Sequence, residues 1–354
     1  MTEAPSTPPP NDRPLDAATR TAVLNQIADS LDRYAFPEVA AKIQADLRDR
    51  IANDGYSDLK SGLQFSETLT AQLQTLSKDL HLKVHFSPAP LPHLDADAEP
   101  TPEELEQQRQ LSRLRNYDFN KIERLAGNIG YLQLFSFEPP EFAGDTAAAA
   151  MAFLAPTHAL IIDIRHNRGG SPGMVALLCS YLLPDYPPVH LNDLYWAAED
   201  RTQQWWTVPF VPGQRYLERP VYVLIGSETF SAAEEFAYNL QQLKRAVIVG
   251  ETSGGGANPG RGIRLDDHFW MFLPTGQAIN PITGSNWEGT GVVPDFKIPS
   301  ELALQAAHLM GLKKLEDTVS SPTLQREVQE AIPMVSNRLD QMQQDLISQI
   351  GGLR

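Results

Sequence analysis

The spacing of apolar residues predicts helices in the first quarter of the chain. Apolar side chains recur there at intervals of three and four, the period of one helix face. Pro37 stands where a second helix would begin, and residues 65–80 give a third. The first two apolar stripes consist of Val23, Ile27, Leu31 and Tyr34, followed by Ala40, Ile43, Leu47 and Ile51. The pattern predicts an N-terminal helical domain over residues 15–87.

The second half of the chain alternates short apolar runs with helical patterns. The run at residues 159–164 is apolar almost throughout, as expected of a strand that is covered on both faces. Alternation of strands and helices is typical of an α/β fold. The expected strands are residues 128–134, 159–164, 221–226, 246–249 and 269–273, and the expected helices between them are residues 145–154, 172–183 and 232–243. We therefore predict an α/β core over residues 116–300, followed by C-terminal helices in residues 301–354.

Three other segments lack a buried pattern. Residues 1–14, rich in proline and threonine, are expected to be disordered. Residues 88–115 form an acidic, proline-rich linker that ends in a polar helix. The aromatic segment around Trp196 and Trp205 is expected to be a loop, which either covers the core or lines a groove for an apolar ligand.

Charge and cysteine content narrow the classes of function. The 354 residues include 44 acidic and 29 basic ones, for a net charge of −15, which argues against nucleic acid as a partner. The single cysteine, Cys179, excludes a disulfide framework. No apolar run approaches the roughly 20 residues of a membrane span, and the N-terminus shows no secretory signal. We expect a cytoplasmic protein.

One serine stands where an apolar run gives way to a helical pattern. Ser231 follows the expected strand at residues 221–226 and opens the expected helix at residues 232–243. Backbone N–H groups at such a helix start are unpaired, and the helix dipole favours negative charge, so a hydroxyl there is well placed to act as a nucleophile. The glycines of residues 250–256, after the next expected strand, allow close approach of the backbone. This arrangement is typical of a serine hydrolase.

The same serine also begins a capping box. Ser231 and Glu234 have the Ser-x-x-Glu spacing in which each side chain satisfies a backbone N–H group at a helix start. Capping and nucleophilic roles are compatible, and both stay open at this point. Asp, Glu and His residues do not cluster at metal-ligand spacing, and no glycine-rich phosphate loop follows the first strand, so we predict neither a metal nor a cofactor.

Four ordered motifs resemble those of the C-terminal processing (tail-specific) peptidases, family forty-one of the serine peptidases. These motifs lie at residues 163–170, 229–234, 250–252 and 286–295. The segments at residues 79–82 and 116–131 resemble more specifically the branch related to interphotoreceptor retinoid-binding protein. The resemblance implies an α/β fold with a ClpP/crotonase-like core, an N-terminal helical domain and C-terminal helices. It also implies no PDZ domain, because residues 88–115 are too few to form one.

The resemblance assigns roles to individual residues. Ser231 matches the nucleophile, and the backbone at Gly169, Gly170 and Ala232 matches the oxyanion hole. The catalytic lysine of the family belongs in residues 254–258, where this chain has none. The related branch often has histidine where Asn258 stands, and an asparagine amide cannot accept the serine proton.

The proton acceptor is therefore sought elsewhere, with His81 and Glu234 as the preferred candidates. Imidazole titrates near neutral pH, which suits a general base. Glu288 either orients a base or caps a turn. We predict a serine-type peptidase of weak or conditional activity that acts on peptides or unfolded protein. The alternative is a binding protein that has lost catalysis and holds an apolar ligand or a peptide.

Overall fold

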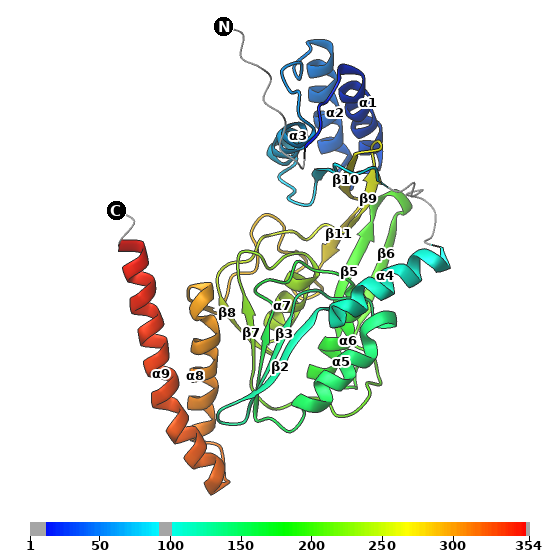
Figure 1. Ribbon diagram of the computed structural model, residues 1–354. Helices are drawn as coiled ribbons and strands as arrows, with labels where there is room; N and C mark the ends of the chain where they lie inside the picture. The colour runs from blue at the N-terminus through cyan, green and yellow to red at the C-terminus, as the bar shows by residue number, and fades with distance from the viewer. Residues whose placement is uncertain (1–11, 92–100, 352–354) are drawn as a thin grey trace. The chain divides into compact units, whose positions relative to one another are not determined.

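The computed structural model of the protein describes residues 12–91 and 101–351 (Figure 1). The chain forms two compact units. The first comprises residues 1–100, 194–203 and 258–278, and the second comprises the remaining residues, 101–193, 204–257 and 279–354. Most of the N-terminal segment expected to be disordered lies outside the described residues. Its last part, Pro14, forms an antiparallel bridge with Ser61.

Among the described residues, the centre of the first unit is a set of three α-helices packed on a three-stranded sheet. The helices are those that the apolar spacing predicts, and Ser61 caps the third by accepting a hydrogen bond from Gln64 N–H. The strands form one antiparallel sheet in the order β1-β10-β9. The elements are α1 (Ala17–Ser30), α2 (Pro37–Ala52), α3 (Gly62–Ser77), β1 (Lys83–Phe86), β9 (Gly260–Arg264) and β10 (Phe269–Pro274).

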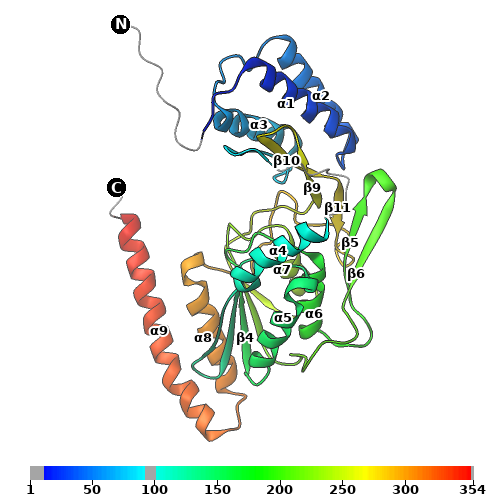
Figure 2. The same ribbon diagram turned by 45° about the vertical axis from the view of Figure 1, so that its right-hand side comes forward.

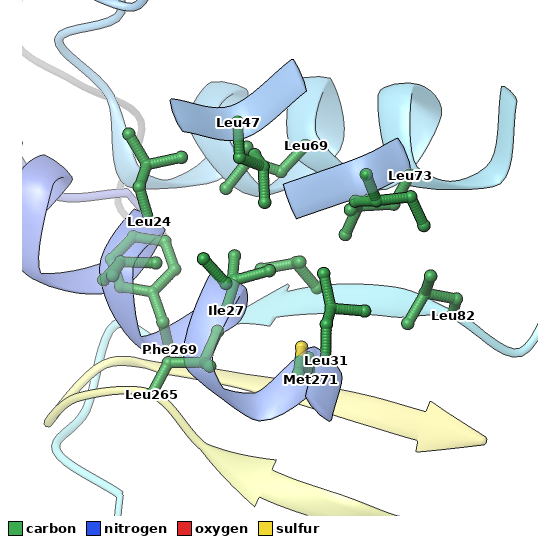
Figure 3. Close-up of a cluster of buried hydrophobic side chains, with 14 of the residues drawn as sticks. Leu24, Ile27, Leu31, Leu47, Leu69, Leu73, Leu82, Leu265, Phe269 and Met271 are labelled. Atoms are coloured by element: carbon green, nitrogen blue, oxygen red, sulfur yellow. The ribbon is translucent and has the colours of Figure 1, made fainter. Parts of the chain in front are cut away.

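The core of the first unit joins segments that are far apart in the sequence. Figure 3 shows Leu24, Ile27 and Leu31 of the N-terminal helices packed over Phe269 and Met271 of β10. The helical domain predicted over residues 15–87 thus completes its apolar core with a hairpin that lies almost two hundred residues further along the chain. The sequence pattern does not reveal this pairing, because it depends on contacts that are distant in sequence.

A six-stranded sheet is the centre of the second unit, in the order β12-β8-β7-β4-β3-β2. Its strands are parallel except for the antiparallel pair β2 and β3. Every residue of β4 and β7 is buried, as the continuous apolar runs predict. The strands are β2 (Phe119–Leu125), β3 (Ile129–Leu134), β4 (Ala159–Asp163), β7 (Val221–Ile225), β8 (Val247–Gly250) and β12 (Phe296–Lys297).

Helices flank this sheet (Figures 1 and 2). α8 (Ala303–Glu316) packs on the face formed by Ile129, Ile161 and Leu224, and α9 (Pro322–Gly351) packs on α8. The other helices of the unit follow the predicted order. They are α4 (Pro102–Leu114), α5 (Pro140–Leu154), α6 (Pro172–Leu182) and α7 (Ala232–Gln242).

The aromatic segment expected to be a loop is instead a β-hairpin. β5 (His190–Trp196) and β6 (Arg201–Trp206) pair with β11 (Gly276–Ile279) in the order β11-β5-β6. The loop prediction is wrong because aromatic residues have a high strand propensity, which a cluster of them does not remove. Within the described residues, no helix combines the length and the apolar character that crossing a membrane requires.

Candidate functional site

Ser231 occupies a strained turn between β7 and α7. Its backbone angles are φ 57° and ψ −126°, outside the regions that residues with a side chain normally adopt. Such a conformation costs on the order of 1–3 kcal/mol and persists only where the surroundings enforce it. The predicted position of the serine at the start of a helix is confirmed, and the strain is a feature that nucleophile turns share.

Asn167 holds the glycine loop against this turn. Its side-chain carbonyl accepts the Gly169 N–H at 2.9 Å, and its backbone carbonyl accepts the Phe230 N–H at 3.1 Å. A methyl group built on Gly169 would lie 2.8 Å from Ser231 Cβ and 3.0 Å from the Ala232 nitrogen. The loop at residues 167–170 and the serine turn are therefore in direct contact.

The three expected oxyanion donors are not equivalent. The Gly169 N–H already donates to Asn167, so it is not available to a ligand. The backbone N–H groups of Gly170 and Ala232, by contrast, donate no hydrogen bond to any atom of residues 12–91 and 101–351. Unpaired backbone donors beside a serine hydroxyl are suited to stabilising an oxyanion.

A buried ion pair fixes the start of the glycine loop. Arg165 donates to both carboxylate oxygens of Asp163, at 2.9 and 2.7 Å, and to the Ser300 carbonyl. Tyr131 donates its hydroxyl to the same carboxylate at 2.7 Å. Burial alone would raise the pKa of Asp163, but the Arg165 guanidinium outweighs it and lowers this pKa below its usual value. The carboxylate is therefore charged and anchors the loop.

The Glu234 carboxylate organises the loop that follows β8. It accepts hydrogen bonds from the N–H groups of Ser231 (2.9 Å), Gly255 (2.6 Å) and Gly256 (2.8 Å), and from the hydroxyl of Ser253 (2.5 Å). Burial raises the pKa of Glu234 to about 7 in spite of these donors. A carboxylate offers about four acceptor positions, and all four are in use. The geometry suits a positioning group better than a proton acceptor.

Ser253 was not among the residues that the sequence singled out. Its hydroxyl donates to Glu234 and accepts the Val292 N–H at 2.7 Å, so it links two loops through one buried atom. The only signal in the sequence was its place within the glycine-rich segment after β8.

Residues 287–289 form hydrogen bonds to the same loop after β8, at residues 255–257. The Glu288 carboxylate accepts the Ala257 N–H at 2.5 Å, and the indole N–H of Trp287 donates to the Gly256 carbonyl at 2.8 Å. The Gly289 N–H donates to the Gly255 carbonyl at 2.9 Å. Glu288 thus has a turn-stabilising contact, which agrees with one of the two roles proposed for it from sequence.

His81 lies in the first unit, next to a buried carboxylate. Burial lowers the pKa of His81 to about 4, so the imidazole is neutral near pH 7. The neighbouring Asp79 accepts hydrogen bonds from the Tyr34 hydroxyl, the Asn258 side-chain amide and the backbone N–H of His81, each at 3.0 Å. Ser231 belongs to the second unit, and a pairing between His81 and Ser231 stays a prediction.

An α/β core that holds a serine on a strained strand–helix turn, with two unpaired N–H groups in the adjoining segments, is an arrangement also found in serine hydrolases. Comparison with known families agrees. The sequence model described as peptidase family S41 matches residues 128–298, and the model described as the N-terminal domain of Peptidase_S41 in eukaryotic IRBP matches residues 17–119. The chain therefore carries the peptidase domain of family S41, preceded by the N-terminal domain of its IRBP-type members.

Curated relatives point to the same family. A carboxy-terminal-processing protease of Bartonella bacilliformis is 27% identical over 183 residues, which are 51% of this chain and 41% of the relative. A tail-specific protease of Haemophilus influenzae is 31% identical over 153 residues, or 40% of this chain and 20% of the relative. The chain spans less than half the length of either protein.

Among solved structures, a putative peptidase from Parabacteroides merdae superposes with a TM-score of 0.57. The match covers 85% of this chain and 99% of that chain at 18% identity. It supports the mixed α/β fold with its central sheet.

Proposed function

We propose that the protein is a serine-type peptidase whose nucleophile is Ser231. The observation that carries the proposal is the strained backbone of Ser231 (φ 57°) in contact with Gly169. A capping serine needs no such strain, because helix caps normally adopt extended angles. Strain at a residue with a reactive hydroxyl therefore favours a catalytic role over capping alone.

In this proposal the Gly170 and Ala232 N–H groups bind the oxyanion that forms when Ser231 attacks a peptide carbonyl. Each such donor contributes about 3 kcal/mol to transition-state stabilisation. Glu234 acts as a positioning residue. Its carboxylate ties the Ser231 N–H to the loop at residues 253–256, which holds the nucleophile in its strained conformation.

The proton acceptor that we propose is His81. The imidazole is neutral near pH 7, which is the form that accepts a proton. Its lowered pKa makes it a weak base, and residues 254–258 supply no lysine. General-base catalysis contributes about 10²–10⁴-fold to rates, so a weak base implies slow turnover.

The substrate class that we propose is a peptide or unfolded protein segment. The named activities of the curated relatives, carboxy-terminal processing and tail-specific proteolysis, support this class. We further propose a ClpP/crotonase-like core without a PDZ domain, supported by the parallel order of β8, β7, β4 and β3 and by the short segment between β1 and α4. A cytoplasmic location agrees with the absence of disulfides and remains part of the proposal.

A second candidate function is binding without catalysis. Asn258 donates its amide to the buried Asp79 carboxylate at 3.0 Å, and both residues are almost fully buried. Asparagine here provides a structural hydrogen bond and no base. A protein that kept the scaffold and lost the base would bind a peptide or an apolar ligand and release it unchanged.

Hydrolysis of an unfolded, fluorescently labelled protein separates the two functions. We expect slow cleavage by the wild type and none by Ser231→Ala. Asn258→His, which places an imidazole beside Asp79, should cleave faster than the wild type. Cleavage that persists in Ser231→Ala would overturn the serine mechanism. No cleavage by the wild type, with cleavage by Asn258→His, would favour the binding protein.

A further inference from the structure

α9 is more than twice as long as the helix on which it packs. It has 30 residues, whereas α8 has 14. At about 1.5 Å per residue, the difference corresponds to roughly 24 Å of helix. Figures 1 and 2 both show the C-terminal part of α9 continuing past the end of α8.

The apolar stripe of α9 continues into this extension. Val328, Ala331 and Val335 are buried in the core shared with α8, and Leu339 packs at its edge. The same spacing of three and four residues continues through Met342 and Leu346. A helix that needed only to cover α8 could become polar after Leu339. Met342 and Leu346 are half-buried in the single chain, so the stripe leaves apolar surface for a further contact.

Two opposite charges flank the stripe on one side. Arg338 and Asp345 are seven residues apart, which places them on the same side of the helix. Arg338 is exposed and, in the described part of the chain, forms no ion pair. Asp345 accepts a hydrogen bond from Gln341 at 2.8 Å. The midpoint between the two charges falls next to Met342.

We propose that this extension pairs with the same segment of a second copy of the chain, antiparallel and about a two-fold axis at Met342. In a two-fold antiparallel pair, the same side of each helix faces the other, and residue i meets residue j as j meets i. Leu339 then meets Leu346 of the second copy. Arg338 faces Asp345 of the second copy, and the symmetry forms both ion pairs together.

The charges on the α9 extension favour a second copy of the chain over an anionic membrane as its binding partner. A helix that lay on an anionic membrane would carry an excess of basic residues on its polar face. Residues 338–346 instead carry one arginine and two aspartates, and the whole chain has a net charge of −15. One positive and one negative residue on the same side of the helix can each pair with the opposite charge of an identical antiparallel helix, so a second copy is the best match.

Sedimentation velocity of the full chain over a concentration series tests this pairing. We expect a reversible dimer whose dissociation constant rises with salt, because the flanking pairs are exposed and screened. Met342→Glu places two like charges at the axis and should give a monomer at every concentration. Arg338→Glu and Asp345→Arg should each weaken the dimer about fivefold or more, the size of two exposed ion pairs lost together.

The combined variant Arg338→Glu with Asp345→Arg restores the opposite charges in reverse order and should return the dissociation constant to near the wild-type value. Asp340→Arg makes the same charge change on the other side of the helix and should leave the dimer intact. Thermal melts that match the wild type confirm that each variant is folded. A monomeric wild type, a dimer that tolerates Met342→Glu, or a double variant without recovery would overturn the proposal.

Discussion

Gly169 lies so close to Ser231 that a single added methyl group would come within 2.8 Å of the serine Cβ. The same methyl group would lie 3.0 Å from the Ala232 nitrogen, which carries one of the two unpaired N–H groups. Gly169 also has a φ of +110°, a value that residues with a side chain rarely adopt. Close approach and backbone conformation together require glycine at this position.

Gly169→Ala should therefore lose both stability and activity. We expect a loss of about 1–3 kcal/mol from the strained backbone conformation, and cleavage below the detection limit because the serine turn must move. Urea unfolding and peptide cleavage measure the two effects. Gly144→Ala is the matched control, because nothing lies within 4 Å of its added methyl group and alanine favours a helix. Equal effects at the two positions would contradict the proposed contact.

Relief of the strain at Ser231 should stabilise the protein. Glycine adopts positive φ without cost, so Ser231→Gly should raise the free energy of unfolding by about 0.5–1 kcal/mol. Ser231→Ala retains a Cβ and should give no such gain. Both variants should be inactive, since both lack the hydroxyl. Calorimetric melting temperatures distinguish them, and a Ser231→Gly protein less stable than Ser231→Ala would contradict the strain.

Glu234→Gln should destabilise the protein although it preserves shape. Each Glu234 carboxylate oxygen accepts at least one backbone N–H. In glutamine one of these oxygens is replaced by an NH₂ group, which cannot accept, so in either orientation of the amide a backbone N–H loses its acceptor. A buried donor left unpaired costs about 1–3 kcal/mol. Urea unfolding should show this loss, and the exposed Glu330→Gln on α9 should show none. An unchanged stability would mean that the loop at residues 253–256 does not depend on Glu234.

Glu235 should make stability fall as the pH rises. Burial raises the pKa of this carboxyl from 4.5 to about 8, although the Asn192 and Asn239 side chains oppose the shift. Between these two values the folded state binds more protons than the unfolded state, so the free energy of unfolding decreases with pH. The contribution is fully present below about pH 4.5 and is lost by about pH 8, at roughly 1.4 kcal/mol per pKa unit.

Glu235→Gln is neutral at every pH and should remove that slope. The comparison is the free energy of unfolding from urea titrations between pH 5 and 8, for the wild type and the variant. Glu234, with a pKa of about 7, contributes a slope of the same sign and remains in both proteins. Parallel pH profiles would show that Glu235 titrates as an ordinary exposed carboxyl.

Local patterns were sufficient for much of the fold and for the centre of the site. The apolar runs located β4 and β7, and the turn between a strand and a helix located Ser231. The aromatic hairpin was missed although aromatic residues favour strands, and its pairing with β11 joins segments that are distant in the sequence. Ser253 was missed because its partners, Glu234 and Val292, come from two other segments of the chain.

The sequence by itself determined the helical and α/β parts, the family motifs and the serine at a helix start, because each depends on residues within a few positions of one another. The tertiary structure decided which donors remain free. The Asn167 side chain accepts the Gly169 N–H, and the Glu234 carboxylate accepts four hydrogen bonds and has no acceptor position left. Hydrogen-bond capacity is shared among segments that meet only after folding, so no pattern along the chain shows which groups are left for a substrate.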